Sequence, residues 1–330
     1  MTRASRPKTR VVVISPPDQR TWRHLAPLED DAEISVSAEL DELAKLLPGA
    51  EVVVFGLSYK PLDLAAAWKH ARSVRWAHSL SAGVEGILFP ALVRSSVPLT
   101  NARGVFKRSL AEFAVLGVLF HYKRVRRLVE NQRAHQWLDH HVMLVADRVM
   151  GVVGYGAIGR ECAMLGSALG MKIHALRRHP QRSEGDALLA RIFEPAELHA
   201  MLGGIDVLVC AAPLTRDTHH LIGEREFEAM KPNAIVINVG RGPVIDESAL
   251  IRALLNRRIA GAALDVFERE PLSSDSPLWG MENVLVSPHS ADHTVDPDWV
   301  ELTMRFFVEN FHRYRSGEQL ENVVDKRAGY

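Results

Sequence analysis

The 330-residue sequence is poor in cysteine, in long apolar runs and in unbalanced charge, and each shortage excludes a class of protein. The 2 cysteines, Cys162 and Cys210, are too few for a disulfide framework and lie in apolar segments, so we expect buried, reduced thiols and a cytoplasmic location. The most apolar helical run, residues 110–120, is shorter than the roughly 20 residues that cross a bilayer. Lys plus Arg and Asp plus Glu both number 40, which predicts neither nucleic-acid nor membrane binding and favours a small-molecule partner.

Short runs rich in β-branched residues alternate with helical patterns along most of the chain, which predicts an α/β fold with parallel sheets. The length allows two domains, because single cores stop growing near roughly 250 residues. We expect a long connecting helix over 108–136 and a last helix over 296–315. The expected strands are 10–15, 50–56, 74–79, 148–154, 171–177, 205–212, 233–240, 259–267 and 283–288.

Three glycines form a G-x-G-x-x-G motif directly between an expected strand and the helical pattern 157–170, the context of a dinucleotide-binding turn. Gly154 would allow the tight turn, Gly156 the close approach of a pyrophosphate, and Gly159 the packing of helix on strand. The helix N-terminus would then face the phosphates. The alternative is a tight turn with no ligand. The residues assigned to this cofactor turn are Gly154, Tyr155, Gly156, Ala157, Ile158 and Gly159.

Two arginines stand where such a motif usually has an acid for the adenosine ribose. Arg177 and Arg178 end the second strand of this domain, and no Asp or Glu follows until Glu184. A guanidinium pairs with a 2′-phosphate, so the sequence predicts NADP(H) as the preferred cofactor, with NAD(H) possible. The alternative is an exposed basic turn.

Further motifs accompany the glycine turn, in order along most of the chain, and together they resemble the D-isomer-specific 2-hydroxyacid dehydrogenases. The resemblance implies two Rossmann-like or flavodoxin-like domains, with a cofactor domain over 116–293 inserted into a discontinuous substrate domain over 1–115 and 294–330. It also implies a homodimer, with the helical region 108–136 and Trp137 as the dimerisation arm. The motifs are "SAGVEGI" (81–87), "TNARGVFKRSLAEF" (100–113), "INVGRGPVIDESALIRAL" (237–254), "GAALDVFEREPL" (261–272) and "SPHSA" (287–291).

The resemblance assigns a catalytic set of Arg241, Glu270 and His289. The planar fork of Arg241 suits a substrate carboxylate, although an arginine capping the next helix is the simpler alternative. His289 is the acid/base for the carbonyl oxygen, chosen among 15 histidines by its position in "SPHSA". Glu270 raises the pKa of that histidine by charge proximity, and Glu268 is the nearest residue that could be mistaken for it.

The remaining assignments also follow from the resemblance. Asp265 would hold the nicotinamide carboxamide, and Pro213, Thr218 and Val239 would line the dinucleotide. Successive backbone N–H groups at 82–84 would form an anion nest for the substrate carboxylate. The sequence departs from many relatives at Glu85, Phe106 and Lys107, which bears on substrate size. The residues of the nest are Ala82, Gly83 and Val84.

We therefore expect an NAD(P)-dependent reduction of a small 2-keto acid, such as glyoxylate or hydroxypyruvate, to the D-2-hydroxy acid. An NAD-dependent enzyme like phosphoglycerate dehydrogenase is an alternative within the family. A dinucleotide-sensing corepressor is an alternative of another class. A scaffold that binds nucleotide without turnover is expected to have lost one of Arg241, Glu270 and His289, and all three are present.

Overall fold

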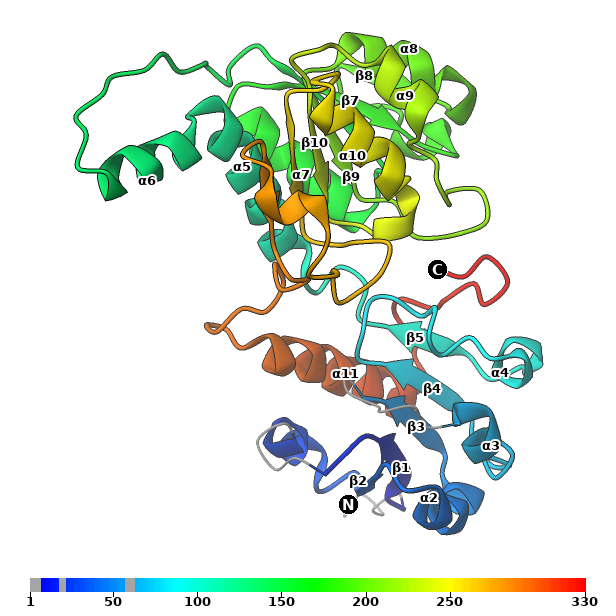
Figure 1. Ribbon diagram of the computed structural model, residues 1–330. Helices are drawn as coiled ribbons and strands as arrows, with labels where there is room; N and C mark the ends of the chain where they lie inside the picture. Colours follow the sequence, from blue (N-terminus) through cyan, green and yellow to red (C-terminus); the bar gives the residue numbers. More distant parts are fainter. Residues whose placement is uncertain (1–6, 18–21, 57–62) are drawn as a thin grey trace. The chain divides into compact units, whose positions relative to one another are not determined.

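The structure is a computed structural model that describes residues 7–17, 22–56 and 63–330. Its contacts divide the chain into two compact units. We call Met1–Val105 with Thr294–Tyr330 the split unit, and Phe106–His293 the inserted unit. Each is an α/β unit with its own parallel sheet, which confirms the fold class expected from the alternating pattern (Figure 1).

The split unit is built on five parallel strands in the order β2-β1-β3-β4-β5, a flavodoxin-like order. Alternate side chains of each strand serve opposite faces: Val12 and Ile14 pack under α2, α3 and α4, whereas Val11 and Val13 face η1 and α11. The elements are β1 (Thr9–Ile14), η1 (Arg23–Leu28), β2 (Ala32–Ser37), α2 (Leu40–Leu46), η2 (Leu47–Gly49), β3 (Val52–Phe55), α3 (Leu64–Trp68), β4 (Trp76–Ser79), α4 (Pro90–Arg94), β5 (Leu99–Asn101) and α11 (Trp299–Ser316).

The last helix of the chain, α11, supplies much of the core on one face of this sheet. The Asp298 side chain caps its start by accepting from the backbone N–H of Val300 at 2.9 Å and of Glu301 at 3.2 Å. Phe307 is fully buried and stacks on Trp76 of β4 with the ring centroids 5.4 Å apart. The helix expected over 296–315 is present as α11, and it covers one face of the five-stranded sheet.

The inserted unit has seven parallel strands in the order β12-β11-β10-β9-β6-β7-β8, a doubly wound, Rossmann-like sheet. Helices α5 and α7 contact one face of the sheet, and α8, α9 and α10 cover the other (Figure 1). Its elements are α5 (Lys107–Tyr122), α6 (Val125–Arg133), β6 (Val149–Val153), α7 (Ala157–Ala168), β7 (Lys172–Leu176), η3 (Pro180–Ser183), β8 (Arg191–Phe193), η4 (Pro195–Glu197), α8 (Leu198–Gly204), β9 (Val207–Cys210), α9 (Glu224–Ala229), β10 (Ile235–Asn238), η5 (Gly242–Val244), α10 (Glu247–Leu255), β11 (Gly261–Leu264), η6 (Pro277–Gly280) and β12 (Val284–Val286).

The expectation of one helix over 108–136 is wrong, because the helix breaks after Tyr122. Arg124 adopts a left-handed backbone conformation with φ 50°. The carbonyl of Tyr122, which an unbroken helix would pair with the N–H four residues on, accepts instead from the N–H of Met143 at 2.9 Å. Lys123 adds a 2.8 Å bond from Nζ to the Met143 carbonyl. The segment that returns along the end of α5 therefore decides where the helix stops.

Both cysteines are free and fully buried, as expected. Burial raises the pKa of each thiol, Cys162 and Cys210, to about 12, so neither forms a thiolate near neutral pH. Among the helices of the described residues, none has both the length and the apolar character that a membrane span requires.

Candidate functional site

The glycine turn joins β6 to α7, and its three glycines meet different surroundings. Gly154 has φ +91°, and a Cβ there would lie 2.5 Å from the backbone nitrogen of Ala212. A Cβ at Gly159 would lie 2.3 Å from the carbonyl oxygen of Gly154. A Cβ at Gly156 would meet no described atom within 4 Å. The fold therefore requires glycine at two positions, and at Gly156 it leaves open space beside the start of α7.

The first turn of α7 presents unpaired backbone donors toward this space. The N–H groups of Ala157, Ile158 and Gly159 donate to no other residue in the described part of the chain, and no side chain caps the helix. A helix N-terminus carries partial positive charge, which suits a pyrophosphate. Open space at Gly156 and free donors after it fit a dinucleotide.

The two arginines after β7 are joined to neighbouring segments. The guanidinium of Arg177 donates to the hydroxyl of Ser183, and Arg178 forms an ion pair with Asp217 at 2.8 Å. Asp217 belongs to a turn in which the Thr218 hydroxyl donates to the Pro213 carbonyl at 2.6 Å. The structure thus brings the basic end of β7 next to the 213–218 turn, and both segments are expected to contact the dinucleotide.

The catalytic candidates lie on the loops that follow β10, β11 and β12. Nδ1 of His289 and Oε2 of Glu270 are 2.6 Å apart. The other carboxylate oxygen of Glu270 accepts from the N–H of Phe267 at 3.0 Å, which fixes the carboxylate on its loop. The charge of Arg241 acts on both groups, and its guanidinium donates to the Gly240 carbonyl at 2.8 Å. The structure therefore gathers the three side chains.

The pair is polarised toward a protonated histidine. The hydrogen bond that His289 donates to Glu270 raises the pKa of His289 above its ordinary value of 6.5, although burial and Arg241 oppose the shift. Burial acts to raise the pKa of Glu270, but the hydrogen bonds from His289 and from the Phe267 N–H outweigh it, so that pKa lies below its ordinary value. Glu270 is therefore ionised and His289 keeps its proton to a higher pH than a free imidazole.

Asp265 is a buried carboxylate with one oxygen satisfied and one orphaned. Asp265 is only 1% exposed to solvent. Oδ1 accepts from the Ser287 hydroxyl at 2.6 Å and from the N–H groups of Ser290 at 3.0 Å and Ala291 at 3.1 Å. Oδ2 is buried and has no partner among the described residues. A carboxamide NH₂ is a suitable donor for that oxygen, so the residues present fit a nicotinamide ring here.

The expected anion nest lies in the split unit, on the loop after β4. The Ala82 carbonyl accepts from the Asn101 side chain at 2.6 Å, and Val84 is buried. Within residues 7–17, 22–56 and 63–330, no acceptor is bonded to the N–H groups of Ala82, Gly83 and Val84. The loop is therefore held from behind while its donors stay available.

Phe106 and Lys107, two of the positions where the sequence departs from many relatives, lie in different environments. Phe106 is buried, and Lys107 lies 3.6 Å from the carboxylate of Glu161 on α7.

Val239, expected to line the dinucleotide, is also buried and donates its N–H to the Cys210 carbonyl at 3.0 Å. Within the described residues, no cluster of side chains has the composition of a metal site.

Sequence reasoning missed a second histidine–glutamate pair close to the catalytic loops. Nε2 of His220 lies 2.5 Å from Oε1 of Glu268, and the Glu268 N–H donates to the Glu247 carboxylate at 3.1 Å. The His220 N–H donates to the Pro243 carbonyl at 2.8 Å. These bonds tie together the loops after β9, β10 and β11. No spacing in the sequence signals the pair, because the partners lie on different loops.

We expect substitutions of the glycine turn to separate folding from ligand binding. Gly156→Ala adds a methyl group into open space at φ −95°, so the melting temperature should stay within a few degrees of wild type while dinucleotide affinity falls about tenfold or more. Gly159→Ala forces a backbone clash and should cost roughly 1–3 kcal/mol of stability. Calorimetric titration and thermal unfolding measure the two effects. Unchanged affinity in a folded Gly156→Ala protein would contradict the assignment.

Comparison of the sequence with known proteins finds a matching family and related enzymes. Residues 115–291 match the family D-isomer specific 2-hydroxyacid dehydrogenase, NAD binding domain. Glyoxylate/hydroxypyruvate reductase B of Salmonella typhimurium is 37% identical over 270 residues, which cover 78% of this chain and 79% of the relative.

Solved structures extend the likeness over nearly the whole chain. An NADPH-dependent glyoxylate/hydroxypyruvate reductase from Sinorhizobium meliloti, in complex with NADP and sulfate, has a TM-score of 0.83 and 29% identity, and covers 98% of this chain and 100% of its own. A D-isomer specific 2-hydroxyacid dehydrogenase from Xanthobacter autotrophicus, in complex with NADPH and MES, has a TM-score of 0.82 and 28% identity, with the same coverage. The chain belongs to the D-isomer specific 2-hydroxyacid dehydrogenase family of NAD(P)-dependent oxidoreductases.

Proposed function

We propose that the protein reduces a small 2-keto acid, of the size of glyoxylate or hydroxypyruvate, to the D-2-hydroxy acid with NADPH. The observation that carries the proposal is the 2.6 Å contact between His289 and Glu270 under the charge of Arg241. The names of the relatives, glyoxylate/hydroxypyruvate reductases, support the substrate class. The buried, reduced cysteines fit a cytoplasmic location.

His289 is the proton donor in this scheme. Nδ1 of His289 donates to the carboxylate of Glu270, which leaves Nε2 as the ring nitrogen that delivers a proton to the carbonyl oxygen of the substrate. The bound reduced nicotinamide supplies the hydride. The carboxylate of Glu270 stabilises the imidazolium before transfer and orients the neutral ring afterwards. In the oxidative direction the neutral ring takes the hydroxyl proton.

Substrate binding is assigned to cationic and backbone donors. Arg241 presents a planar fork of N–H groups that pairs with a carboxylate or a carbonyl oxygen. The N–H groups of residues 82–84 would add a carboxylate nest without side-chain charge. Both assignments favour a compact anionic substrate.

Cofactor binding is assigned to the inserted unit. The turn at 154–159 would hold the pyrophosphate, and Oδ2 of Asp265 would accept from the nicotinamide carboxamide. Arg177 and Arg178 would pair with the 2′-phosphate, which makes NADPH the preferred cofactor. Complexes with NADP or NADPH among the similar structures support this preference.

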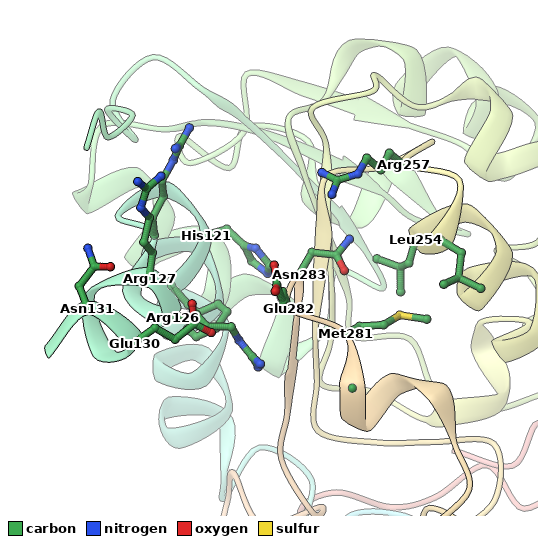
Figure 2. A pocket seen from close by; sticks show the side chains of 14 residues that line it. His121, Arg126, Arg127, Glu130, Asn131, Leu254, Arg257, Met281, Glu282 and Asn283 are labelled. Atoms are coloured by element: carbon green, nitrogen blue, oxygen red, sulfur yellow. The ribbon is translucent and has the colours of Figure 1, made fainter. Parts of the chain in front are cut away.

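The inserted unit carries an apolar surface that favours a homodimer. Helix α6 and the segment after it extend away from the seven-stranded sheet (Figure 1). Trp137 is fully exposed, and Leu144 is mostly exposed. A hollow of about 770 Å³ lies between α6 and the η6–β12 turn, and charged and polar side chains such as Arg126, Arg127 and Glu130 make up most of its lining (Figure 2). We assign the hollow to the 134–144 segment of a second copy, because exposed apolar side chains such as Trp137 and Leu144 mark interfaces on a folded unit.

The proposed reaction has a direct test. Purified protein with NADPH is expected to consume glyoxylate and hydroxypyruvate, with kcat/KM for NADPH above that for NADH. Arg177→Asp should reverse or abolish the preference by removing a phosphate partner and adding a like charge. Absorbance of the reduced cofactor follows both measurements. No oxidation with glyoxylate, hydroxypyruvate, pyruvate or a bulky aromatic keto acid would overturn the proposal and favour a dinucleotide-binding protein.

The pH profile tests the His289–Glu270 pair. Because the raised pKa keeps His289 protonated, kcat/KM for reduction should hold above pH 6.5 and fall as pH rises through that pKa. Glu270→Gln removes the stabilising charge, so the alkaline limb should move to lower pH. His289→Ala should lower kcat about 10²–10⁴-fold. Glu268→Gln is the matched control and should leave the limb in place; an unmoved limb in Glu270→Gln would refute the role of Glu270.

The oligomer is tested by sedimentation velocity. Wild-type protein is expected to sediment as a dimer, and Trp137→Ser should weaken the dimer at least tenfold, because an exposed aromatic side chain of this size is a typical interface anchor. Val295→Ser removes an equally exposed apolar side chain from the split unit and should leave the dimer intact. A monomeric wild-type protein would contradict the assignment of the hollow.

A further inference from the structure

One carboxylate, that of Asp186, ties the segment that follows β7 to the glycine turn. Apart from the short η3 turn, residues 177–190 contain no regular element before β8 begins. Oδ2 of Asp186 accepts from the Tyr155 hydroxyl at 3.1 Å and from Nε of Arg160 at 2.9 Å. Oδ1 accepts from the N–H of Leu188 at 3.2 Å. Both carboxylate oxygens are therefore engaged.

The partners of Asp186 come from the dinucleotide turn itself. Tyr155 is the residue between the first two glycines and is 4% exposed, and Arg160 lies in the first turns of α7. The carboxylate thus connects the segment on the adenosine side to the turn on the pyrophosphate side. Tyr155 is well packed, so it offers a fixed anchor point for the more exposed segment.

The connection continues from Asp186 to Arg177. The Asp186 N–H donates to the Ser183 carbonyl at 3.1 Å, and the Ser183 hydroxyl accepts from the guanidinium of Arg177. The Arg177 N–H donates to the Phe193 carbonyl at 2.9 Å, so its backbone is fixed at the edge of the sheet. The backbone N–H of Asp186 and the hydroxyl of Ser183 therefore link the anchored segment to the guanidinium of Arg177.

Asp186 is poorly suited to bind a ribose itself. Burial acts to raise its pKa, but the hydrogen bonds from the Leu188 N–H, Arg160 and Tyr155 outweigh burial and hold the pKa below its ordinary value. It is therefore an ionised acceptor whose lone pairs are used inside the protein. An acid that selects NADH would instead have an oxygen available for the 2′-hydroxyl.

We propose that Asp186 is a positioning residue for cofactor selection, which fixes the 177–186 segment so that Arg177 meets the 2′-phosphate of NADPH. The inference rests on the proposed NADPH preference. A long arginine side chain on an unanchored segment loses much conformational entropy when it binds, whereas an anchored one has lost that freedom on folding. NADH has no 2′-phosphate and gains little from this arrangement.

The test compares the binding of two adenosine fragments and two cofactors. In Asp186→Ala, the Kd of adenosine 2′,5′-bisphosphate should rise about tenfold, while that of 5′-AMP should change less than twofold. KM for NADPH should rise in parallel at unchanged kcat, and the values for NADH should stay near wild type. Calorimetry supplies the fragment affinities and steady-state assays supply the split between KM and kcat.

Three further variants make the result specific. Asp186→Asn keeps an oxygen acceptor for the Tyr155 hydroxyl and should lose less NADPH preference than Asp186→Ala. Tyr155→Phe removes one of the three bonds and should have an intermediate effect. Glu184→Ala removes an exposed carboxylate from the same segment and should leave both affinities unchanged.

The outcomes separate this inference from the proposed function. If wild-type protein binds NADPH and NADH equally, the proposed cofactor preference fails. If wild type prefers NADPH and Asp186→Ala keeps the preference, the inference about Asp186 is overturned. An equal loss of affinity for both fragments, with a lower melting temperature, would also overturn it, because the carboxylate would then serve only folding.

Discussion

The candidate active site depends on the hydrogen bonds that the buried side chain of Asp265 accepts. One of its oxygens gathers a hydroxyl and two backbone N–H groups from residues 287–291, and its own carbonyl accepts from the His289 N–H at 2.9 Å. The chain after β12 is therefore wrapped around a buried carboxyl group at the end of β11. That wrapping fixes the backbone of His289, which has φ 50°, a conformation that few residues other than glycine adopt.

Several other carboxylates act in the same way, by joining loops at the carboxyl ends of the strands. Glu270 joins His289 to the loop after β11, Glu268 joins that loop to His220, and Asp186 joins the segment after β7 to the glycine turn. Loops on the surface of a sheet have few apolar contacts to hold them. Charge-assisted hydrogen bonds supply directional contacts in their place, and they leave the surface polar enough for a charged cofactor and an anionic substrate.

The sequence predicts central strands and the glycine turn well, because both have local causes. Strands covered on both faces are continuous apolar runs, and a dinucleotide turn needs glycine at fixed spacing. The three strands absent from the expectation, β2, β5 and β8, are all edge strands, where exposed or polar residues such as Glu33 and Arg191 interrupt the apolar pattern.

The residues of the candidate site also differ in how far the sequence alone predicts them. The motif resemblance points to Arg241, Glu270 and His289, which the structure gathers, while their roles and those of the cofactor residues stay predictions. The pairs Asp186–Tyr155 and His220–Glu268 leave no local signature, because each joins residues brought together only by the order of strands in the sheet. The break after Tyr122 has the same origin, a backbone contact from a returning segment.

The position of α11 in the split unit also sets an order of events during synthesis. Phe307 and Phe311 cover the face of the sheet that carries Trp76, so this core stays uncovered until residues 299–316 leave the ribosome. The inserted unit is contiguous and ends at residue 293, so its folding needs nothing that is translated later. Residues translated after the inserted unit thus complete a core begun before it, and a nascent chain arrested before residue 299 would expose an apolar sheet face to chaperones.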